Sequence, residues 1–314
     1  MKVLVTGGSG FIGTHVVNKL VAHGIDVRIM DMILPKEMGP GVEFIKGSIL
    51  DLDDTRTAMH RVDAVIHLAA VADVGEVFKD PHYAEAINVR GTANVLESMR
   101  VVGLNRIVFG STTWVYSDVE ETDVDESTPL RAPSHLYTAT KVAGEFYCRS
   151  YAELYGLETT VLRFGIPYGP GARPAAVIPI FVNRALDGEP LTLAGDGLQF
   201  RKFIYVEDLA EGIVAALRPA AIGQTYNLDG QEKVSIKQIA ETIQKILGDV
   251  TIEYGPARPG DFPGKVASSE KAGRELDWRA TTPFEEGVRR YVAWYQGQIE
   301  ERAAARARVD QALL

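Results

Sequence analysis

The chain has 314 residues, 46% of them hydrophobic, which is long enough to bury a large core and to form two lobes. Its 33 basic and 42 acidic residues give a net charge of −9, which argues against binding to nucleic acid or to an anionic membrane surface. Cys148 is the single cysteine and cannot form an internal disulfide, so we expect a reducing, cytoplasmic compartment. We expect no membrane span, no signal peptide before the first predicted strand and, without clustered Cys and His residues, no metal site.

The amino-terminal segment has the pattern of a nucleotide-binding loop. Residues 2–6 (KVLVT) form a predicted strand, residues 7–13 (GGSGFIG) a glycine-rich turn and residues 15–23 an amphipathic helix. Gly7, Gly10 and Gly13 permit a tight turn and a close approach to a pyrophosphate, which the free N–H groups of the helix would bind. The first gap is one residue longer than in the common dinucleotide motif, and a plain structural turn is the alternative.

The second predicted strand, residues 26–30, ends at Asp31. A carboxylate at this strand end accepts hydrogen bonds from ribose hydroxyls and repels a 2′-phosphate. No arginine follows within the next few residues to bind such a phosphate. The segment therefore favours NAD over NADP, with an ordinary turn aspartate as the alternative.

Strands and helices alternate over the first half of the chain. Further strands are predicted at residues 42–46, 63–68, 105–109 and 159–164, and helices at residues 52–60, 83–102 and 134–155. This order predicts an α/β fold with a doubly wound parallel (Rossmann) sheet. Ligands of such sheets bind at the carboxyl ends of the strands, where many of the polar and glycine residues named here would gather.

The helix predicted at residues 134–155, with Ser134 as the candidate N-cap, carries a pair of reactive side chains. Tyr137 and Lys141 are four residues apart and therefore share one helix face. A free tyrosine has a pKa of about 10, and a cation one turn away, with the positive end of a nicotinamide, would favour the phenolate. Tyr137 is thus a candidate acid/base for a sugar or alcohol hydroxyl. Such pairs also occur by chance; the nucleotide loop upstream makes catalysis the better interpretation.

The composition changes after residue 164. Proline and glycine cluster at residues 167–171 and 256–264. We expect an NAD-binding Rossmann domain at residues 1–165 and a smaller C-terminal α/β substrate lobe at residues 166–314. The last stretch, residues 299–314, is rich in Ala, Arg and Glu and would form a terminal helix or a loose tail.

Taken together, several short motifs resemble the extended short-chain dehydrogenase/reductase family, in its nucleotide-sugar epimerase/dehydratase branch. The matching segments are TGGSGFIG at residues 6–13, HLAA at 67–70, NVRGT at 88–92, Tyr137 with Lys141, YGP at 168–170, GDGLQFRKFIYVED at 195–208 and RPGD at 258–261. Each motif is short, but their joint order is specific. The resemblance implies that about residues 203–229 return to the Rossmann domain.

The resemblance also implies roles for the matching residues. Tyr137 would be the acid/base, Lys141 would hold the nicotinamide ribose, and Thr112 would bond the reacting sugar oxygen. The implied cofactor-binding residues are Gly7, Gly10, Phe11, Ile12, Gly13, Asp31, Ser48, Ile49, Leu68, Ala69, Ala70, Asn88, Ser111, Tyr137 and Lys141. The implied substrate-binding residues are Thr112, Asn88, Ile166, Val177, Arg201, Arg258 and Asp261. Here the two arginines would clamp the diphosphate, unless they form surface ion pairs.

Five positions depart from the family pattern. Dehydratases of the family carry an Asp-Glu pair directly after the catalytic threonine, and decarboxylases a glutamate two residues after it; here Thr113 and Trp114 stand there, so both chemistries lack their carboxylate. Ile166 replaces an asparagine that contacts the diphosphate sugar, and Ser48 replaces an aspartate that binds the adenine amino group. Ala72 lies near where some epimerases have a lysine.

The resemblance and its departures together favour an NAD-dependent nucleotide-sugar epimerase acting at C4, of the UDP-glucose/UDP-galactose type. The alternative is a 4-keto-sugar reductase or sugar-nucleotide dehydrogenase that exchanges its cofactor in each turnover. A 4,6-dehydratase and a non-catalytic nucleotide-sensing relative are weaker alternatives. The resemblance also implies a homodimer in which the helices at residues 83–102 and 134–155 pair with their copies.

Overall fold

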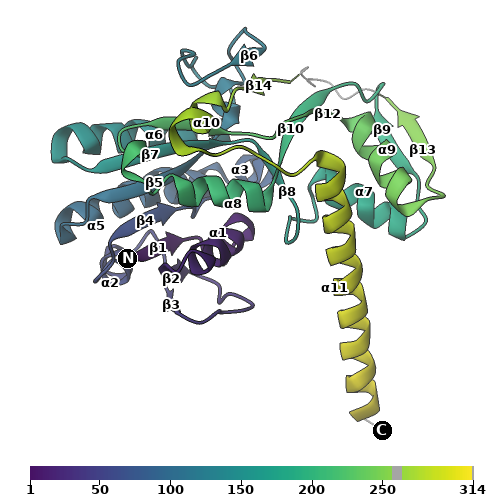
Figure 1. The fold of residues 1–314 in the computed structure, drawn as a ribbon, viewed down its shortest axis with the longest axis horizontal. Coiled ribbons are helices and arrows are strands. Elements are labelled where there is room, and N and C mark those ends of the chain that lie inside the picture. Colours follow the sequence, from purple (N-terminus) through teal and green to yellow (C-terminus); the bar gives the residue numbers. More distant parts are fainter. Residues whose placement is uncertain (257–263, 313–314) are drawn as a thin grey trace.

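A computed structural model describes residues 1–256 and 264–312 (Figure 1). Its centre is one sheet of seven parallel strands in the order β11-β7-β5-β4-β1-β2-β3. The strands are β1 (Lys2–Thr6), β2 (Asp26–Asp31), β3 (Val42–Lys46), β4 (Ala64–His67), β5 (Arg106–Thr112), β7 (Glu158–Phe164) and β11 (Thr225–Leu228). The doubly wound parallel sheet predicted from the sequence is confirmed.

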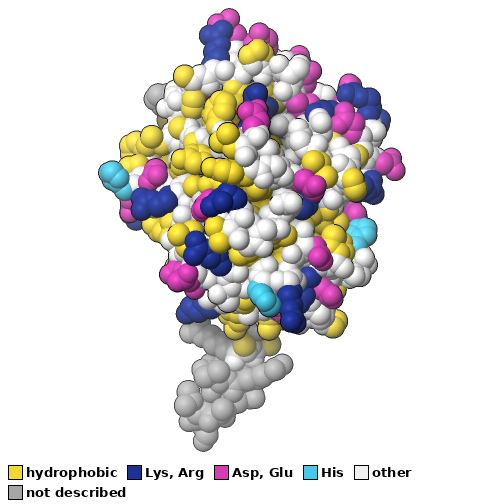
Figure 2. Space-filling model, turned by 90° about the vertical axis from the view of Figure 1, so that its left-hand side faces the viewer, with side chains coloured by type: hydrophobic (Ala, Val, Ile, Leu, Met, Phe, Trp, Pro, Cys, Tyr) yellow, Lys and Arg dark blue, Asp and Glu magenta, His cyan; other side chains and the backbone are white. Residues whose placement is uncertain are grey.

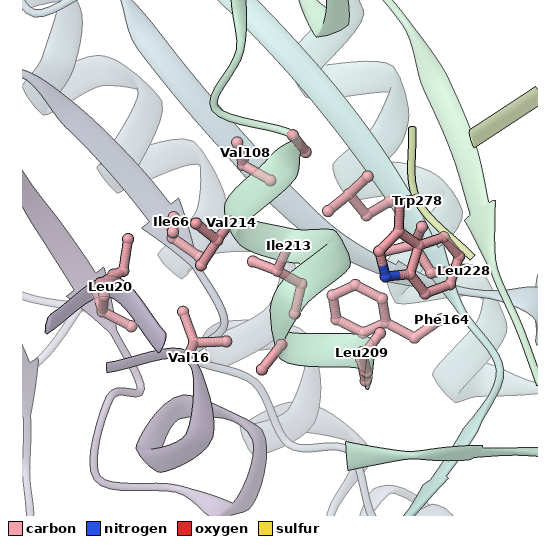
Figure 3. Close-up of a cluster of buried hydrophobic side chains, with 14 of the residues drawn as sticks. Val16, Leu20, Ile66, Val108, Phe164, Leu209, Ile213, Val214, Leu228 and Trp278 are labelled. Atoms are coloured by element: carbon pink, nitrogen blue, oxygen red, sulfur yellow. The ribbon is translucent and has the colours of Figure 1, made fainter. Parts of the chain in front are cut away.

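Helices cover both faces of this sheet because its strands are apolar on both sides. On one face, α1 (Phe11–Ala22), α8 (Val206–Ala215) and α10 (Glu270–Leu276) pack on Val3 and Val5 of β1 and their neighbours. Figure 3 shows Ile213 and Leu209 of α8 in this cluster. On the other face, α2 (Leu52–Ala58), α5 (Thr92–Val102) and α6 (Leu136–Tyr155) pack on the set that includes Leu4.

A second, smaller lobe lies beside the carboxyl ends of these strands (Figure 1). Its strands are β8 (Ile166–Tyr168), β10 (Phe200–Tyr205) and β12 (Lys233–Ser235) in one sheet, and β9 (Leu191–Ala194) with β13 (Ile252–Gly255) in another. The helices α7 (Val177–Leu186), α9 (Ile236–Leu247) and the start of α11 (Phe284–Ala312) share its core. A short pair, β6 (Asp123–Val124) and β14 (Val266–Ala267), completes the sheets.

The chain crosses between the lobes more than once. β11 joins the large sheet and α8 packs on it, although both follow β8 in sequence. Trp278, after α10, is also part of the first lobe's core and donates from Nε1 to the carbonyl of Asp208 at 2.9 Å. We therefore propose a division at residue 165, with the α10 segment and most of residues 203–229 assigned to the first lobe. The end of β10 stays with the second lobe, whose core holds Phe203 and Tyr205.

Two helices differ from the prediction. The segment predicted as one helix at residues 83–102 consists of α4 (Pro81–Glu85), a π-helical turn (Ala86–Gly91) and α5. The predicted N-cap Ser134 is wrong: His135 caps α6, its Nδ1 accepting from the Tyr137 N–H at 3.1 Å. The Ser134 hydroxyl instead donates to Asp118 at 2.7 Å.

The C-terminal stretch is a helix and not a loose tail: α11 extends to Ala312 and projects from the body of the molecule (Figure 1). Within the described ranges no helix has the length and apolarity needed to cross a membrane.

Candidate active site

A cavity of about 1270 Å³ lies between the two lobes. Its floor is the carboxyl edge of the large sheet, where β1, β2, β4, β5 and β7 end. Its other wall comes from the segments around β8, α7 and β9 of the second lobe. This is the crevice in which open α/β sheets bind their ligands. The volume suits two molecules of nucleotide size rather than one small ligand.

The glycine loop forms a cradle at one end of the cavity. Gly7 has a φ of +73°, a conformation that favours glycine, and a Cβ at this residue would lie 2.7 Å from the backbone nitrogen of Ala69. A Cβ on Gly13 would lie 2.2 Å from the carbonyl oxygen of Gly7. The N-terminus of α1 follows directly and adds its free N–H groups. Bare backbone and a helix terminus are the features a pyrophosphate requires, so the loop fits a dinucleotide.

Asp31 lies at the end of β2, beside this cradle. Its carboxylate accepts from the backbone N–H of Ser9 and of Ile33, both at 3.1 Å, so the side chain is held in place before any ligand binds. Ser48 and Ile49 line the same end of the cavity. A fixed carboxylate here suits ribose hydroxyls and opposes a 2′-phosphate, which fits NAD.

Tyr137, Lys141 and Thr112 all line the cavity. Tyr137 lies in the first turn of α6, where the helix dipole favours a negative charge. Thr112 ends β5, and its side chain lies close enough to the Tyr137 hydroxyl to lower the pKa of that group. The Lys141 ammonium is buried one turn further along α6, 4.7 Å from the centre of the Phe109 ring. The pairing of strand end and helix start thus fixes three proton-handling groups together.

The protein alone does not ionise this tyrosine. Burial raises the pKa of Tyr137 to about 12, against the opposing effects of the Thr112 hydrogen bond and the charge of Arg173. Burial also lowers the pKa of Lys141 to about 8. Without the cofactor, Lys141 therefore does not lower the pKa of Tyr137 as the sequence led us to expect. A bound cation near Tyr137, such as a nicotinamide ring, would lower the pKa of this tyrosine.

Asn88 works as a clamp. It lies in the π-helical turn, a feature common at functional sites. Its Oδ1 accepts from the Val71 N–H at 2.7 Å, and its Nδ2 donates to the Val71 carbonyl and to Thr140, both at 3.0 Å. These bonds tie the loop after β4 to α6, next to Lys141. The amide is 2% exposed, so the geometry supports a role through the loop more than a direct ligand contact.

The second lobe supplies the remaining predicted residues. Ile166, Val177 and Arg201 line the cavity, as do Gly10, Phe11, Ile12, Leu68, Ala70 and Ser111 from the first lobe. Arg258 and Asp261 lie outside the described residues. Among the residues that are described, no cluster of His, Cys, Asp or Glu side chains is arranged to hold a metal ion.

Two further residues were missed in the sequence. Arg173 lines the cavity and its charge acts on Tyr137; its position just after the YGP motif was a usable signal. The Glu145 side chain is 11% exposed and accepts a hydrogen bond from the Ser111 hydroxyl at 2.6 Å. It lies four residues after Lys141, so helix spacing alone places it on the same face.

Comparison with known proteins agrees with this site. Residues 3–229 match the model of the NAD dependent epimerase/dehydratase family. The putative UDP-glucose 4-epimerase of Methanocaldococcus jannaschii is 34% identical over 301 residues, 93% of this chain and 97% of that protein. The chain belongs to the NAD-dependent epimerase/dehydratase family, which confirms the resemblance in the motifs, and it is an enzyme acting on nucleotide sugars with NAD as cofactor.

Solved structures are similar over nearly the whole chain. UDP-glucose 4-epimerase of Thermotoga maritima, crystallised with UDP-glucose, has a TM-score of 0.89 at 30% identity and covers 95% of this chain and 100% of its own. UDP-glucuronic acid 4-epimerase of Bacillus cereus, in complex with UDP-glucuronic acid and NAD, has a TM-score of 0.87 at 29% identity with the same coverage. These relatives act on different sugars, so family membership leaves the substrate open.

Proposed function

We propose that the protein is an NAD-dependent 4-epimerase of a UDP-sugar, UDP-glucose and UDP-galactose being the first candidates. The observation that carries the proposal is the grouping of Thr112 and Tyr137 beside buried Lys141, in a cavity that has one described carboxylate. That carboxylate, Asp31, lies at the end of β2, by the glycine cradle. Epimerisation at C4 needs an acid/base and a hydride carrier, but no additional carboxylate.

The residues divide the work as follows. The glycine cradle would hold NAD, which would supply the acceptor and later the donor for the C4 hydride. Tyr137, ionised beside the positively charged nicotinamide ring, would take the proton of the sugar's 4-hydroxyl and return it at the end of the reaction. The Thr112 hydroxyl would donate a hydrogen bond to the Tyr137 phenolate, and Lys141 would balance the negative charge of that phenolate. The cavity leaves room for the 4-keto sugar to turn about its diphosphate linkage between the two hydride transfers.

A dehydratase is less well supported. Elimination needs a carboxylate to remove the C5 proton, directly after the catalytic threonine. Thr113 and Trp114 occupy those positions, and the Trp114 ring packs edge-on to His135 with 6.0 Å between ring centres. The alternative of a net reductase or dehydrogenase uses the same residues and is separated by experiment, since it consumes cofactor in every turnover.

Arg173 favours a hexuronate as a second candidate substrate. Its guanidinium acts electrostatically on Tyr137, and a carboxylate at C6 would be close to the C4 that reacts there. The Bacillus cereus relative that binds UDP-glucuronic acid gives this candidate independent support. UDP-glucuronate is therefore the second compound to test.

Proton NMR of UDP-glucose with the purified protein and catalytic NAD, without reductant, tests the proposal. A new anomeric signal for UDP-galactose, absent with Tyr137→Phe, is the expected result. UDP-glucuronate, UDP-N-acetylglucosamine and 4-keto sugars with NAD(P)H follow in the same assay. Stoichiometric cofactor turnover in place of epimerisation would establish the reductase, and no conversion of any of these compounds would overturn the epimerase.

We further propose a homodimer through α5 and α6. Figure 2 looks onto the side of the molecule on which these helices lie and shows hydrophobic side chains among the charges. Phe146 and Leu154 of α6 are 61% and 72% exposed, too apolar a pair for a solvated helix face. Sedimentation at micromolar concentration should show a dimer that Phe146→Glu with Leu154→Glu dissociates, while Phe78→Glu on α3 (Val74–Lys79) leaves it intact. A monomeric wild type contradicts the proposal.

A further inference from the structure

A third ionisable residue continues the line of Tyr137 and Lys141 along α6. Glu145 follows Lys141 by one more helical turn, and its side chain is 11% exposed. Its place is behind the cavity wall, because Ser111, its hydrogen-bond partner, lines the cavity next to Thr112. The reaction described above makes no use of it.

Glu145 has a full set of strong partners. Its Oε1 accepts from the Ser111 hydroxyl at 2.6 Å and from Arg163 Nε at 3.0 Å, and its Oε2 accepts from Arg163 Nη2 at 2.7 Å. The other arm of Arg163, Nη1, donates to the Tyr116 hydroxyl at 2.6 Å, which donates to Asn227 at 3.0 Å. The network thus joins α6 to β5, β7 and β11 at the carboxyl edge of the sheet. Bidentate, charge-assisted bonds of this kind fix geometry firmly.

We propose that Glu145 is a positioning residue of the active site, whose carboxylate fixes the end of β5 through Ser111 and supplies the negative charge that balances Lys141. The role rests on the proposed epimerase function, because Lys141 must stay cationic to support the Tyr137 phenolate. Glu145 itself touches neither sugar nor cofactor.

The groups around Lys141 leave the balancing charge to Glu145. On β4, buried His67 faces Lys141 and is neutral near pH 7, since burial lowers its pKa to about 3. On β5, Phe109 presents only its ring. On α6, burial raises the pKa of the Cys148 thiol to about 12, so this group is neutral as well.

Tyr137 on α6 is also protonated near neutral pH without the cofactor, because burial raises its pKa to about 12. Burial lowers the pKa of Lys141 to about 8, and the charges of Cys148, when ionised, and of Glu145 oppose that fall. Cys148 is neutral near pH 7, which leaves Glu145. With Glu145 neutralised, Lys141 would lose its proton within the physiological range. Arg163, whose pKa the ion pair with Glu145 raises in spite of burial, remains charged beside the carboxylate.

Glu145→Gln tests the charge with little change of shape. At an effective dielectric constant of about 20, removing a charge one helical turn away shifts a midpoint by at least one pH unit, or tenfold in the equilibrium. We expect the Lys141 midpoint to fall by about that amount. The pH profile of kcat should narrow on both sides, since the lysine loses its proton at lower pH and the tyrosine then ionises only at higher pH.

The matched control is Glu97→Gln. Glu97 accepts two bonds from Arg100, at 2.9 and 2.7 Å, and one from the Tyr151 hydroxyl at 3.3 Å, so it repeats the chemistry of Glu145 away from Lys141. Should Glu145→Gln fail to fold with Arg163 unpaired, the double variant Glu145→Gln with Arg163→Met removes both buried charges. The Lys141 midpoint is expected to fall by less in the double variant, because the loss of the Arg163 cation partly offsets the loss of the carboxylate.

The experiment is an NMR titration of the protein labelled with 13Cε-lysine, in which the signal missing from Lys141→Arg assigns Lys141. A midpoint that falls in Glu145→Gln and stays in Glu97→Gln supports the proposal. An unchanged midpoint in Glu145→Gln, or in the double variant, overturns it. The titration needs no substrate, so a wild type that epimerises nothing would remove the proposed function while the NMR result still decides the charge relationship.

Discussion

Asp73 and Arg173 form an ion pair of 2.5 Å that ties the first lobe to the second. Asp73 is the N-cap of α3 and accepts from the N–H of Gly75 and Glu76, while Arg173 lies in the segment between β8 and α7. The same guanidinium acts on Tyr137. One contact therefore links the relative position of the lobes to the charge around the catalytic hydroxyl.

Arg173→Met and Asp73→Asn should shift the pH profile of kcat in opposite directions. Removing the guanidinium raises the pKa of Tyr137, so the acidic limb moves to higher pH. Asp73→Asn keeps the helix cap but no longer neutralises Arg173, so that limb moves to lower pH. Both side chains are more than a third exposed, so the unfolding free energy should change by less than about 1 kcal/mol. Shifts in the same direction would contradict this relationship.

Tyr137→Phe should reduce kcat by roughly 10²- to 10⁴-fold, the usual contribution of a general acid/base. The loss is in proton transfer, so NAD binding measured by calorimetry should change little. Thr112→Ser, which keeps a hydroxyl on β5 for Tyr137, is the matched control and should retain most of the activity. An equal loss of kcat in both variants would indicate that the substitutions disturb the cavity wall in general.

The sequence predicts the framework of this site because its signals are local. Apolar runs ending in glycine or aspartate mark β1 and β2, and a spacing of four places Tyr137 with Lys141. Six of the seven strands follow from the alternation of such runs with helices, whereas β11 is not marked by this pattern. These features depend on neighbouring residues only, and the structure retains them.

The parts that the sequence misses depend on contacts between distant segments. Ser134 resembles an N-cap, but Asp118, 16 residues earlier, binds its hydroxyl, and the cap passes to His135. Asp73 and Arg173 lie 100 residues apart, and each looks like an ordinary surface charge in sequence. Such partners become visible only when the topology brings the strand ends together.

Gly13→Ala should damage both the fold and cofactor binding. A Cβ at this residue would lie 2.2 Å from the Gly7 carbonyl oxygen and 2.7 Å from Gly8 Cα, both backbone atoms that cannot move aside without opening the turn. Overpacking of this kind costs about 1–3 kcal/mol in unfolding free energy. The control is Gly39→Ala, where a Cβ meets no atom within 4 Å, and its stability should stay within about 0.5 kcal/mol of wild type. Denaturant unfolding and NAD titration of both variants provide the measurement.

Asp229→Asn should stabilise the protein, and more at pH 8 than at pH 5. Asp229 follows β11 and is 4% exposed; a Cβ on Gly165 would lie 2.0 Å from its Oδ1, so the carboxyl packs under the loop that begins the second lobe. Burial raises the pKa of Asp229 to about 7. The charge of Lys202 and the hydrogen bond that Oδ1 accepts from the Gly230 N–H oppose this rise.

The sign follows from proton binding. Between the ordinary aspartate pKa of about 4 and the folded value of about 7, the folded state binds more protons than the unfolded state, so stability falls as pH rises and levels off above that window. Asparagine retains the acceptor for Gly230 and carries no charge. The difference in unfolding free energy between the variant and the wild type should therefore grow by about 2 kcal/mol from pH 5 to pH 8. Urea unfolding at both pH values measures it, and a difference that is constant or shrinks with pH would show that Asp229 ionises in the folded protein as it does in the unfolded chain.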